Sequence, residues 1–252
     1  MKRRLHHLFR EDGKILIVAM DHAAFMDRPL PGLAHPGEII SQVVAGGADA
    51  VMTTFGTACR FTDELAGCGL IITVRNDDPQ AEESVLAALA AGADGVKRMI
   101  YPWLDSDPYS VTYGFRTGDV CKRWQVPYLA EVVPGGFEAG PELRTPEKIA
   151  AGARIGAEAG ADLVKTFYPG TPDGLRVVVD NCYAPVVILG GPRMDSDRDL
   201  LEVVKGAMEG GGKGVAIGTN IWRHPRPAKI VSAIAAVIHD DATVEQALKL
   251  VD

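Results

Sequence analysis

Short apolar runs rich in valine, isoleucine and leucine recur along the chain, and segments with helical character separate them. Runs of this length and composition are typical of strands buried on both faces, as in a parallel sheet. The pattern predicts eight strands, at about residues 15–21, 49–54, 69–74, 94–100, 127–133, 162–168, 185–189 and 214–218. The helices predicted between them include Pro36–Ala45, Ala81–Ala91, Pro146–Ala159, Asp197–Glu209 and Pro227–His239.

A short phrase repeats where these helices lead into strands. Its copies are Gly47-Ala-Asp-Ala-Val-Met52, Gly92-Ala-Asp-Gly-Val-Lys97, Gly160-Ala-Asp-Leu-Val-Lys165 and a degenerate Gly211-Gly-Lys-Gly-Val-Ala216. Glycine is the usual residue just beyond the C-terminal end of a helix, so each copy marks a turn from helix to strand. Eight strands alternating with helices in 252 residues predict a (β/α)8 TIM barrel; an open doubly wound sheet is the alternative.

No linker or low-complexity tract divides the chain, so we expect a single (β/α)8-barrel catalytic domain over residues 1–252. Two long loops are expected in this barrel. One is Ala23–Gly37, rich in proline and glycine, after the first strand, and the other is Pro102–Thr117, rich in aromatic residues, after the fourth. Loops that follow the strands carry the chemistry of such barrels.

Composition narrows the range of partners. The formal net charge is −7 and the lysines and arginines are scattered, whereas nucleic acid and anionic membranes need a clustered basic surface. No run approaches the ~20 apolar residues of a membrane span, and Ile15–Met20 is too short for a signal peptide. We expect a cytoplasmic protein with no nucleic-acid or membrane partner. Without a CxxC pair or zinc-like spacing, free thiols are expected at Cys59, Cys68, Cys121 and Cys182.

The lysines can be sorted by their place in the barrel, because active sites lie at the C-terminal ends of the strands. Lys213 precedes the last strand and is set aside. Lys165 lies within the sixth strand, in Asp-Leu-Val-Lys-Thr-Phe-Tyr, among apolar and aromatic residues. Burial lowers a lysine pKa from about 10.4 and favours the neutral amine that attacks a ketone to form a Schiff base. A lysine that reaches the rim or pairs with a carboxylate is the alternative.

Three further ionisable residues fall at strand ends. Lys97, in the fourth strand, could lower the pKa of Lys165 or hold a substrate oxygen; a rim salt bridge is the alternative. Glu131, in the fifth strand, is expected to act as a general acid and base, or else to form a structural ion pair with Lys97. Asp21 ends the first strand and could bind a substrate hydroxyl, with a turn role as the alternative. His22 follows Asp21 directly and is left unassigned.

Two glycine clusters end the seventh and eighth strands: Gly190-Gly191-Pro192 and Ile217-Gly218-Thr219-Asn220. Loops after these two strands form the usual phosphate site of such barrels, from backbone N–H groups and a helix N-terminus. We therefore expect Gly190, Gly191, Gly218 and Thr219 to bind a phosphate group. Plain tight turns are the alternative.

Metal and nucleotide chemistry are not expected. No HxH or HExxH spacing occurs among the six histidines, which are His6, His7, His22, His35, His224 and His239. No Walker loop is present, and no GxGxxG follows the first strand. The sequence therefore predicts an enzyme without a metal or an organic cofactor.

Four motifs together resemble the archaeal-type class I fructose-bisphosphate aldolases. They are Ala-Met-Asp-His after the first strand, Gly-Ala-Asp-Leu-Val-Lys-Thr-Phe-Tyr-Pro-Gly on the sixth, Gly-Gly-Pro-Arg on the seventh and Ala-Ile-Gly-Thr-Asn-Ile-Trp on the eighth. The similarity covers nearly the whole chain, and the four motifs fall in the family's order and spacing. The resemblance implies that Lys165 is the Schiff-base lysine, that Asp21 is a partner in substrate-hydroxyl binding and proton transfer, and that Gly190, Gly191 and Gly218 bind phosphate.

The chain departs from this family at two places. Archaeal-type members carry Trp-x-Tyr on the fifth strand, and the matching positions here are Glu131 and Val133. The set Asp21, Lys97, Glu131 and Lys165 instead resembles the Asp/Lys/Glu/Lys set of eukaryotic class I aldolases and tagatose-bisphosphate aldolases. The second departure is Thr219, where family members often have arginine.

Together these residues predict a reversible carbon–carbon lyase that cleaves a phosphorylated ketose into dihydroxyacetone phosphate, or a related ketone, and an aldehyde. Its partner is a small sugar phosphate or a similar anionic ketose, and we expect a homo-oligomer. The rival enzymes are a thiolase or a transaldolase-like synthase with the same Schiff-base lysine. A catalytically silent sugar-phosphate-binding barrel and an isomerase without a Schiff base are the alternatives outside this chemistry.

Overall fold

The chain forms a closed barrel of parallel strands, seen in a computed structural model that describes residues 3–191 and 193–251. Each strand pairs with its neighbours in sequence, and β1 closes the barrel on β8. The strands are β1 (Ile15–Ala19), β2 (Ala50–Thr54), β3 (Gly69–Thr73), β4 (Gly95–Ile100), β5 (Tyr128–Val132), β6 (Leu163–Thr166), β7 (Val186–Leu189) and β8 (Gly214–Ile217). Every strand lies within its predicted range. Closure confirms the (β/α)8 barrel and excludes the doubly wound sheet.

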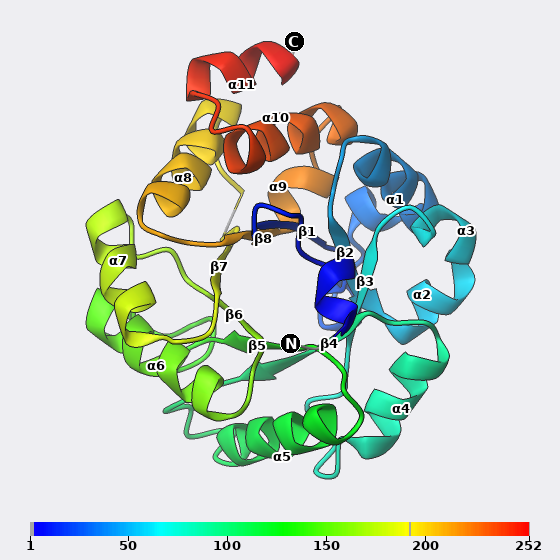
Figure 1. Ribbon diagram of the computed structural model, residues 1–252, viewed down its shortest axis with the longest axis vertical. Helices are drawn as coiled ribbons and strands as arrows, with labels where there is room; N and C mark the ends of the chain where they lie inside the picture. Colours follow the sequence, from blue (N-terminus) through cyan, green and yellow to red (C-terminus); the bar gives the residue numbers. More distant parts are fainter. Residues whose placement is uncertain (1–2, 192, 252) are drawn as a thin grey trace.

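Helices surround the barrel in sequence order (Figure 1). The α-helices are α1 (Pro36–Ala45), α2 (Phe55–Arg60), α3 (Thr62–Leu65), α4 (Glu82–Ala90), α5 (Ser110–Arg123), α6 (Pro146–Glu158), α7 (Pro172–Asn181), α8 (Asp197–Glu209), α9 (Thr219–Trp222), α10 (Pro227–His239) and α11 (Val244–Val251). Short 3-10 turns are η1 (Arg3–His7), η2 (His22–Ala24), η3 (Pro31–Leu33) and η4 (Pro141–Leu143). Within the described residues, no helix has the length and apolar character needed to cross a membrane. Met1 and Lys2 lie outside the described residues, and so does Pro192, which belongs to the first glycine cluster.

The predicted loop Pro102–Thr117 is wrong in its second half, because α5 already begins at Ser110. Its sequence is rich in glycine, threonine and aromatic residues, which favour helices poorly. Close packing against the sheet overrides this preference. A Cβ atom at Gly114 would lie 2.6 Å from the Ile100 side chain, and one at Gly118 would overlap the Ala159 carbonyl oxygen. These glycines therefore allow α5 to approach β4 and the end of α6.

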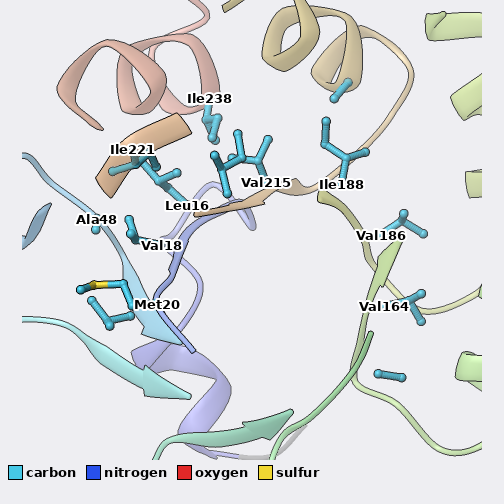
Figure 2. Close-up of a cluster of buried hydrophobic side chains, with 14 of the residues drawn as sticks. Leu16, Val18, Met20, Ala48, Val164, Val186, Ile188, Val215, Ile221 and Ile238 are labelled. Carbon is cyan, nitrogen blue, oxygen red and sulfur yellow. The ribbon is translucent and has the colours of Figure 1, made fainter. Parts of the chain in front are cut away.

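Side chains of each strand alternate between two apolar layers. One set points outward to the helices and includes Leu16, Val18, Val164, Val186, Ile188 and Val215 (Figure 2). The other set points into the barrel and includes Ile15, Ile17, Met52, Ile71, Leu129, Leu163 and Val187. Leu8, from the N-terminal segment, joins this inner cluster from below. Apolar side chains thus fill the barrel interior toward the N-terminal ends of the strands. The polar side chains that point inward lie at the C-terminal ends.

His239, at the end of α10, links the N-terminal segment to the end of the barrel where the strands begin. The Nδ1 atom of His239 lies 2.8 Å from the Asp12 carboxylate and its Nε2 atom lies 3.0 Å from the Asp49 carboxylate. Asp49 also accepts the backbone N–H of Leu16 at 2.6 Å and pairs with Arg10. Burial lowers the pKa of His239, but its hydrogen bonds to Asp49 and Asp12 outweigh this and raise that pKa above its ordinary value.

His239→Gln is expected to destabilise the protein at acidic pH more than at alkaline pH. The pKa of His239 is higher in the folded state, so its stabilising contribution is full below the unfolded value of about 6.5. It is lost as pH rises through the folded pKa. The deficit in melting temperature relative to wild type should therefore be largest near pH 6 and shrink toward pH 9. The exposed His35→Gln is the control, and a deficit of His239→Gln that stays constant over this range contradicts the expectation.

Candidate active site

Four ionisable side chains meet at the C-terminal end of the barrel and form a continuous chain of ion pairs. The ammonium of Lys97 lies 2.9 Å from Asp21 Oδ2 and 2.8 Å from Glu131 Oε2. The other Glu131 oxygen, Oε1, lies 2.6 Å from Lys165 Nζ. Glu131 therefore bridges two lysines, and Lys97 bridges two carboxylates. The structure brings together all four residues that the sequence had singled out.

The twofold alternation of the strands explains this meeting. Asp21 continues the inward row of Ile15, Ile17 and Ala19 on β1. Glu131 and Lys165 each come two residues after an inward leucine, on strands where Glu131 is paired in register with Lys165. Residues of one row share one face of the sheet, so all these side chains point into the barrel. The polar set thus lies directly above the apolar filling.

The site is buried, and each charge is stabilised by its neighbours. Asp21 and Lys165 are 5% exposed, Glu131 is 4% exposed and Lys97 is 1% exposed. Burial raises the pKa values of the Asp21 and Glu131 carboxyls, but the charges of Lys97 and Lys165 outweigh this and hold both well below their ordinary values. Burial lowers the pKa of Lys97, but Asp21 and Glu131 outweigh this and hold that pKa well above its ordinary value. Both carboxylates and the Lys97 ammonium are therefore charged at neutral pH.

Two residues that the sequence analysis missed support this chain. Thr73, the last residue of β3, donates its hydroxyl at 2.7 Å to Asp21 Oδ2, the oxygen that Lys97 also contacts, and so helps to fix the carboxylate. The Phe25 ring lies 5.6 Å from Lys97 Nζ, a distance suited to a cation–π contact. Thr73 occupies an inward strand-end position, so the rule that found the lysines could have found it. Phe25 follows η2 in an irregular segment, where no periodicity points to it.

His22 lies between the ion-pair chain and the glycine clusters. Its Nδ1 atom is 3.8 Å from Asp21 Oδ1 and its ring meets that of Trp222 edge-on, with centroids 5.6 Å apart. Burial lowers the pKa of His22, which favours the neutral imidazole. The residue belongs to the 3-10 turn η2 rather than to β1, so strand alternation does not decide where it points.

The glycine clusters after β7 and β8 are tied together by Asn220. Its amide nitrogen donates to the Gly190 carbonyl at 3.2 Å, and its Oδ1 accepts the backbone N–H of Met194 at 2.8 Å. A Cβ atom at Gly218 would overlap both the Ala19 carbonyl oxygen and the His22 ring, so only glycine fits there without a shift. Thr219 begins the short helix α9 directly after Gly218. Asn220 lies inside the second cluster, but no role was predicted for it from the sequence.

Metal ligands do not gather in the part of the chain that the structure describes: no group of three or more His, Cys, Asp or Glu side chains is arranged to hold an ion. The four cysteines form no disulfide within the described residues. The ion-pair chain supplies amine and carboxylate groups at the barrel mouth. An amine beside a carboxylate can become neutral by passing its proton across the 2.6 Å contact between Lys165 and Glu131, and a neutral amine adds to carbonyl groups.

The fold and the site define a TIM barrel with two buried lysines and two buried carboxylates at its C-terminal face. Residues 15–224 match the model of the DeoC/LacD family aldolases, and the chain belongs to that family. A solved archaeal fructose 1,6-bisphosphate aldolase is 29% identical with a TM-score of 0.82, covering 95% of this chain and 99% of that one. A solved Schiff-base-forming fructose-1,6-bisphosphate aldolase is 30% identical with the same TM-score of 0.82, covering 94% and 99%.

A curated relative carries a synthase name. The 2-amino-3,7-dideoxy-D-threo-hept-6-ulosonate synthase of Halobacterium salinarum is 32% identical over 94% of this chain and 91% of its own length. The family and these relatives establish an aldolase-type enzyme, and they include both aldolases and a synthase.

Proposed function

We propose that this chain is a metal-independent class I aldolase, formed by a single catalytic barrel, that reversibly cleaves a phosphorylated ketose into dihydroxyacetone phosphate or a related ketone and an aldehyde. The observation that carries this proposal is the contact of 2.6 Å between Lys165 Nζ and Glu131 Oε1 inside a buried site. It supplies a nucleophile and a proton acceptor at one point. The Schiff-base-forming relative supports the same chemistry.

In the first step, Glu131 takes a proton from Lys165, and the free amine attacks the ketose carbonyl at C2. The carbinolamine oxygen leaves as water after Glu131 returns a proton to it, and a protonated Schiff base remains. Lys97 stays charged throughout, since two carboxylates hold its pKa high. It can therefore stabilise a substrate oxygen as negative charge develops there.

Carbon–carbon cleavage follows from the cationic Schiff base. Glu131 accepts the proton of the C4 hydroxyl, the C3–C4 bond breaks, and its electron pair moves into the iminium to form an enamine. Asp21, held by Thr73 and Lys97, binds a substrate hydroxyl and keeps it aligned for this transfer. Protonation of C3 and addition of water then release the ketone and restore Lys165.

The phosphate of the ketose is assigned to backbone N–H groups of Gly190, Gly191, Gly218 and Thr219. These residues follow β7 and β8, the usual phosphate-binding position of this fold. Asn220 supports the assignment, because it holds the two loops at one distance from each other.

Gly218→Ala is expected to weaken the use of phosphorylated substrates while the protein stays folded. The added Cβ atom must displace the β1 end or the His22 ring, and the backbone N–H groups move with it. Because displacements near 1 Å at a positioned site cost up to about 10²-fold, we expect kcat/KM to fall by roughly 10- to 100-fold. Gly56→Ala is the matched control, since a Cβ atom there meets nothing within 4 Å. Equal kinetics of the two variants would remove Gly218 from the phosphate site.

The proposed function is tested by reducing the protein with sodium borohydride in the presence of dihydroxyacetone phosphate. An iminium becomes a stable secondary amine, so the intact mass should rise by one reduced ligand, and peptide mapping should place it on Lys165. A screen of phosphorylated and sulfonated ketoses in the same format identifies the natural ketose. A protein that gains no mass with any of them is not a Schiff-base aldolase, and a silent binding barrel or an isomerase becomes the better reading.

Activity is expected to survive prolonged chelation by EDTA. The catalytic groups proposed above are side chains of the chain itself, and no step uses a metal ion. The measurement is the rate of aldehyde release before and after dialysis against EDTA, with a zinc-dependent aldolase treated in parallel. Loss of activity that zinc or cobalt restores would contradict the Schiff-base mechanism.

A synthase or a transaldolase-like enzyme is the second candidate, favoured by the name of the Halobacterium salinarum relative. It shares the iminium step with the aldolase and differs in the direction or the partner of the carbon–carbon step. Incubating the unreduced protein with the ketone and single aldehydes, and comparing the rates of ketose formation and ketose cleavage, separates the two. The expected homo-oligomer stays a prediction, which light scattering checks.

A further inference from the structure

The two oxygens of the Asp21 carboxylate have different neighbours. Oδ2 accepts the Thr73 hydroxyl at 2.7 Å and lies 2.9 Å from Lys97 Nζ. Oδ1 instead faces the imidazole of His22, whose Nδ1 atom lies 3.8 Å away. That separation is too long for a direct hydrogen bond. A hydroxyl oxygen placed at about 2.8 Å from each atom would hydrogen-bond to both.

The Nδ1 atom of His22 is buried and has no hydrogen-bond partner within the described residues. The side chain as a whole is 27% exposed, so the ring is open at one edge while its Nδ1 edge is turned toward Asp21. A buried polar atom without a hydrogen bond costs free energy, and a molecule that supplies the missing bond is bound more tightly for that reason. Nδ1 is therefore a position where a bound molecule can be recognised.

Neighbours on both sides hold the His22 ring in this orientation. The Trp222 ring meets it edge-on, with centroids 5.6 Å apart. A Cβ atom at Gly218 would lie 2.4 Å from its Cε1 and 3.1 Å from its Nε2, so the Gly218 backbone lies directly against the imidazole. The ring thus reaches from the second glycine cluster to the ion-pair chain.

The charge state of His22 suits a hydrogen-bond donor. Burial lowers its pKa and outweighs the opposing charge of Asp21, so the imidazole is neutral at neutral pH and carries one N–H. The Asp21 carboxylate favours the tautomer with this hydrogen on Nδ1, because the N–H dipole then points toward the negative charge. A donor and an acceptor therefore face each other across the 3.8 Å gap.

From this geometry we infer that His22 Nδ1 and Asp21 Oδ1 together bind the hydroxyl on C3 of the ketose, which accepts from the imidazole and donates to the carboxylate. The inference rests on the proposed function. In the half of the substrate that carries the phosphate, C1 is esterified and C2 is bonded to Lys165, so C3 holds the one free hydroxyl. Glu131 remains the acceptor of the C4 hydroxyl proton. The ketone class is then one with a hydroxyl on the carbon that forms the new bond, and His22 is a specificity-determining residue for it.

The test uses two ketone phosphates that differ by this hydroxyl. Dihydroxyacetone phosphate carries it, and hydroxyacetone phosphate has a methyl group in its place. Both can form an iminium, so the rate of borohydride trapping on the full chain is measured over a range of concentrations of each ketone. Wild type is expected to trap dihydroxyacetone phosphate with a second-order rate constant roughly 100-fold higher, because one hydrogen bond to a charged group and one to a neutral group depend on the hydroxyl.

Two variants separate the hydrogen bond from the packing of the ring. His22→Phe keeps a ring and removes the hydrogen bond, whereas His22→Asn removes the ring and keeps a polar atom near the Nδ1 position. The preference for dihydroxyacetone phosphate should fall about tenfold in His22→Phe and stay within about threefold of wild type in His22→Asn. The ratio between the two ketones, compared with wild type, cancels their intrinsic reactivities.

Two further variants complete the set. His22→Leu takes the place of His22→Phe should the larger ring not fit against Gly218. His35→Asn, at an exposed histidine before α1, is the matched control and should leave the preference unchanged.

Each other outcome overturns one statement. If neither ketone forms an adduct on Lys165, the proposed function fails and the inference fails with it. If adducts form but wild type shows no preference for dihydroxyacetone phosphate, the inference alone is overturned. It is also overturned if His22→Phe keeps the wild-type preference, since the ring would then only pack against Trp222 and Gly218. An equal loss in His22→Phe and His22→Asn would overturn the assignment to Nδ1.

Discussion

Lys165→Ala is expected to abolish both the borohydride adduct and carbon–carbon cleavage. No other group can replace an iminium as the acceptor of the C3–C4 electron pair, and removal of a covalent nucleophile costs roughly 10⁴- to 10⁶-fold in turnover. The variant should stay folded, because Glu131 keeps its ion pair with Lys97 after Lys165 is removed. Circular dichroism and intact mass after reduction give the two readings on one preparation.

The control for this result is Lys213→Ala. Lys213 is an exposed lysine that precedes β8 at the opposite end of the barrel, so its removal should leave the adduct and the rate unchanged. The informative failure is a Lys165→Ala protein that still gains the ligand mass. Mapping of that adduct to Lys97 would transfer the nucleophile to β4 and leave Lys165 as its charged neighbour.

The fold could be predicted because its two sequence signals are local. Apolar runs mark the strands, and the glycine that ends each helix marks the turn before a strand. Barrel closure is not local, but eight alternating units in a chain of this length rarely form another architecture. The end of the loop after β4 could not be predicted, since the glycines of α5 have low helix propensity and only the close approach to Ile100 accounts for them.

The candidate site was predictable to the extent that it lies on strands. Alternation with a period of two, together with the rule that chemistry lies at the C-terminal strand ends, brings Asp21, Lys97, Glu131 and Lys165 to one point. The same rule does not reach His22 or Phe25, which lie in and directly after a 3-10 turn with no fixed period. Asn220 was missed for another reason: its role is to join two loops, and no pattern within one segment reveals such a contact.

The ion-pair chain also changes what Glu131 can be expected to do. From the sequence, Glu131 was either a proton-transfer residue or the structural partner of Lys97. The structure places it within 2.8 Å of Lys97 and 2.6 Å of Lys165, so the two roles are not exclusive. Its carboxylate neutralises buried charge and also touches the amine that must lose a proton. A loss of stability on mutation therefore no longer argues against a catalytic role.

Glu131→Gln is expected to lower turnover by roughly 10²- to 10⁴-fold per folded molecule, which is the usual contribution of a positioned acid or base. Glutamine keeps the shape and still accepts a hydrogen bond from Lys97 or Lys165, but it cannot take up the amine proton or the C4 hydroxyl proton. The variant should also lose stability, by about 3 kcal/mol, because two buried lysines are left with Asp21 as the single carboxylate of the chain of ion pairs.

Chemical denaturation gives the folded fraction of the Glu131→Gln protein. The rates of single-turnover cleavage and of borohydride trapping are then measured on that fraction, and the exposed Glu138→Gln is the matched control. Trapping should slow together with cleavage, since carbinolamine dehydration needs the same group. A variant that is destabilised yet cleaves at a near wild-type rate per folded molecule would make Glu131 a purely structural ion-pair partner, and Asp21, the other carboxylate on Lys97, would then be the proton acceptor.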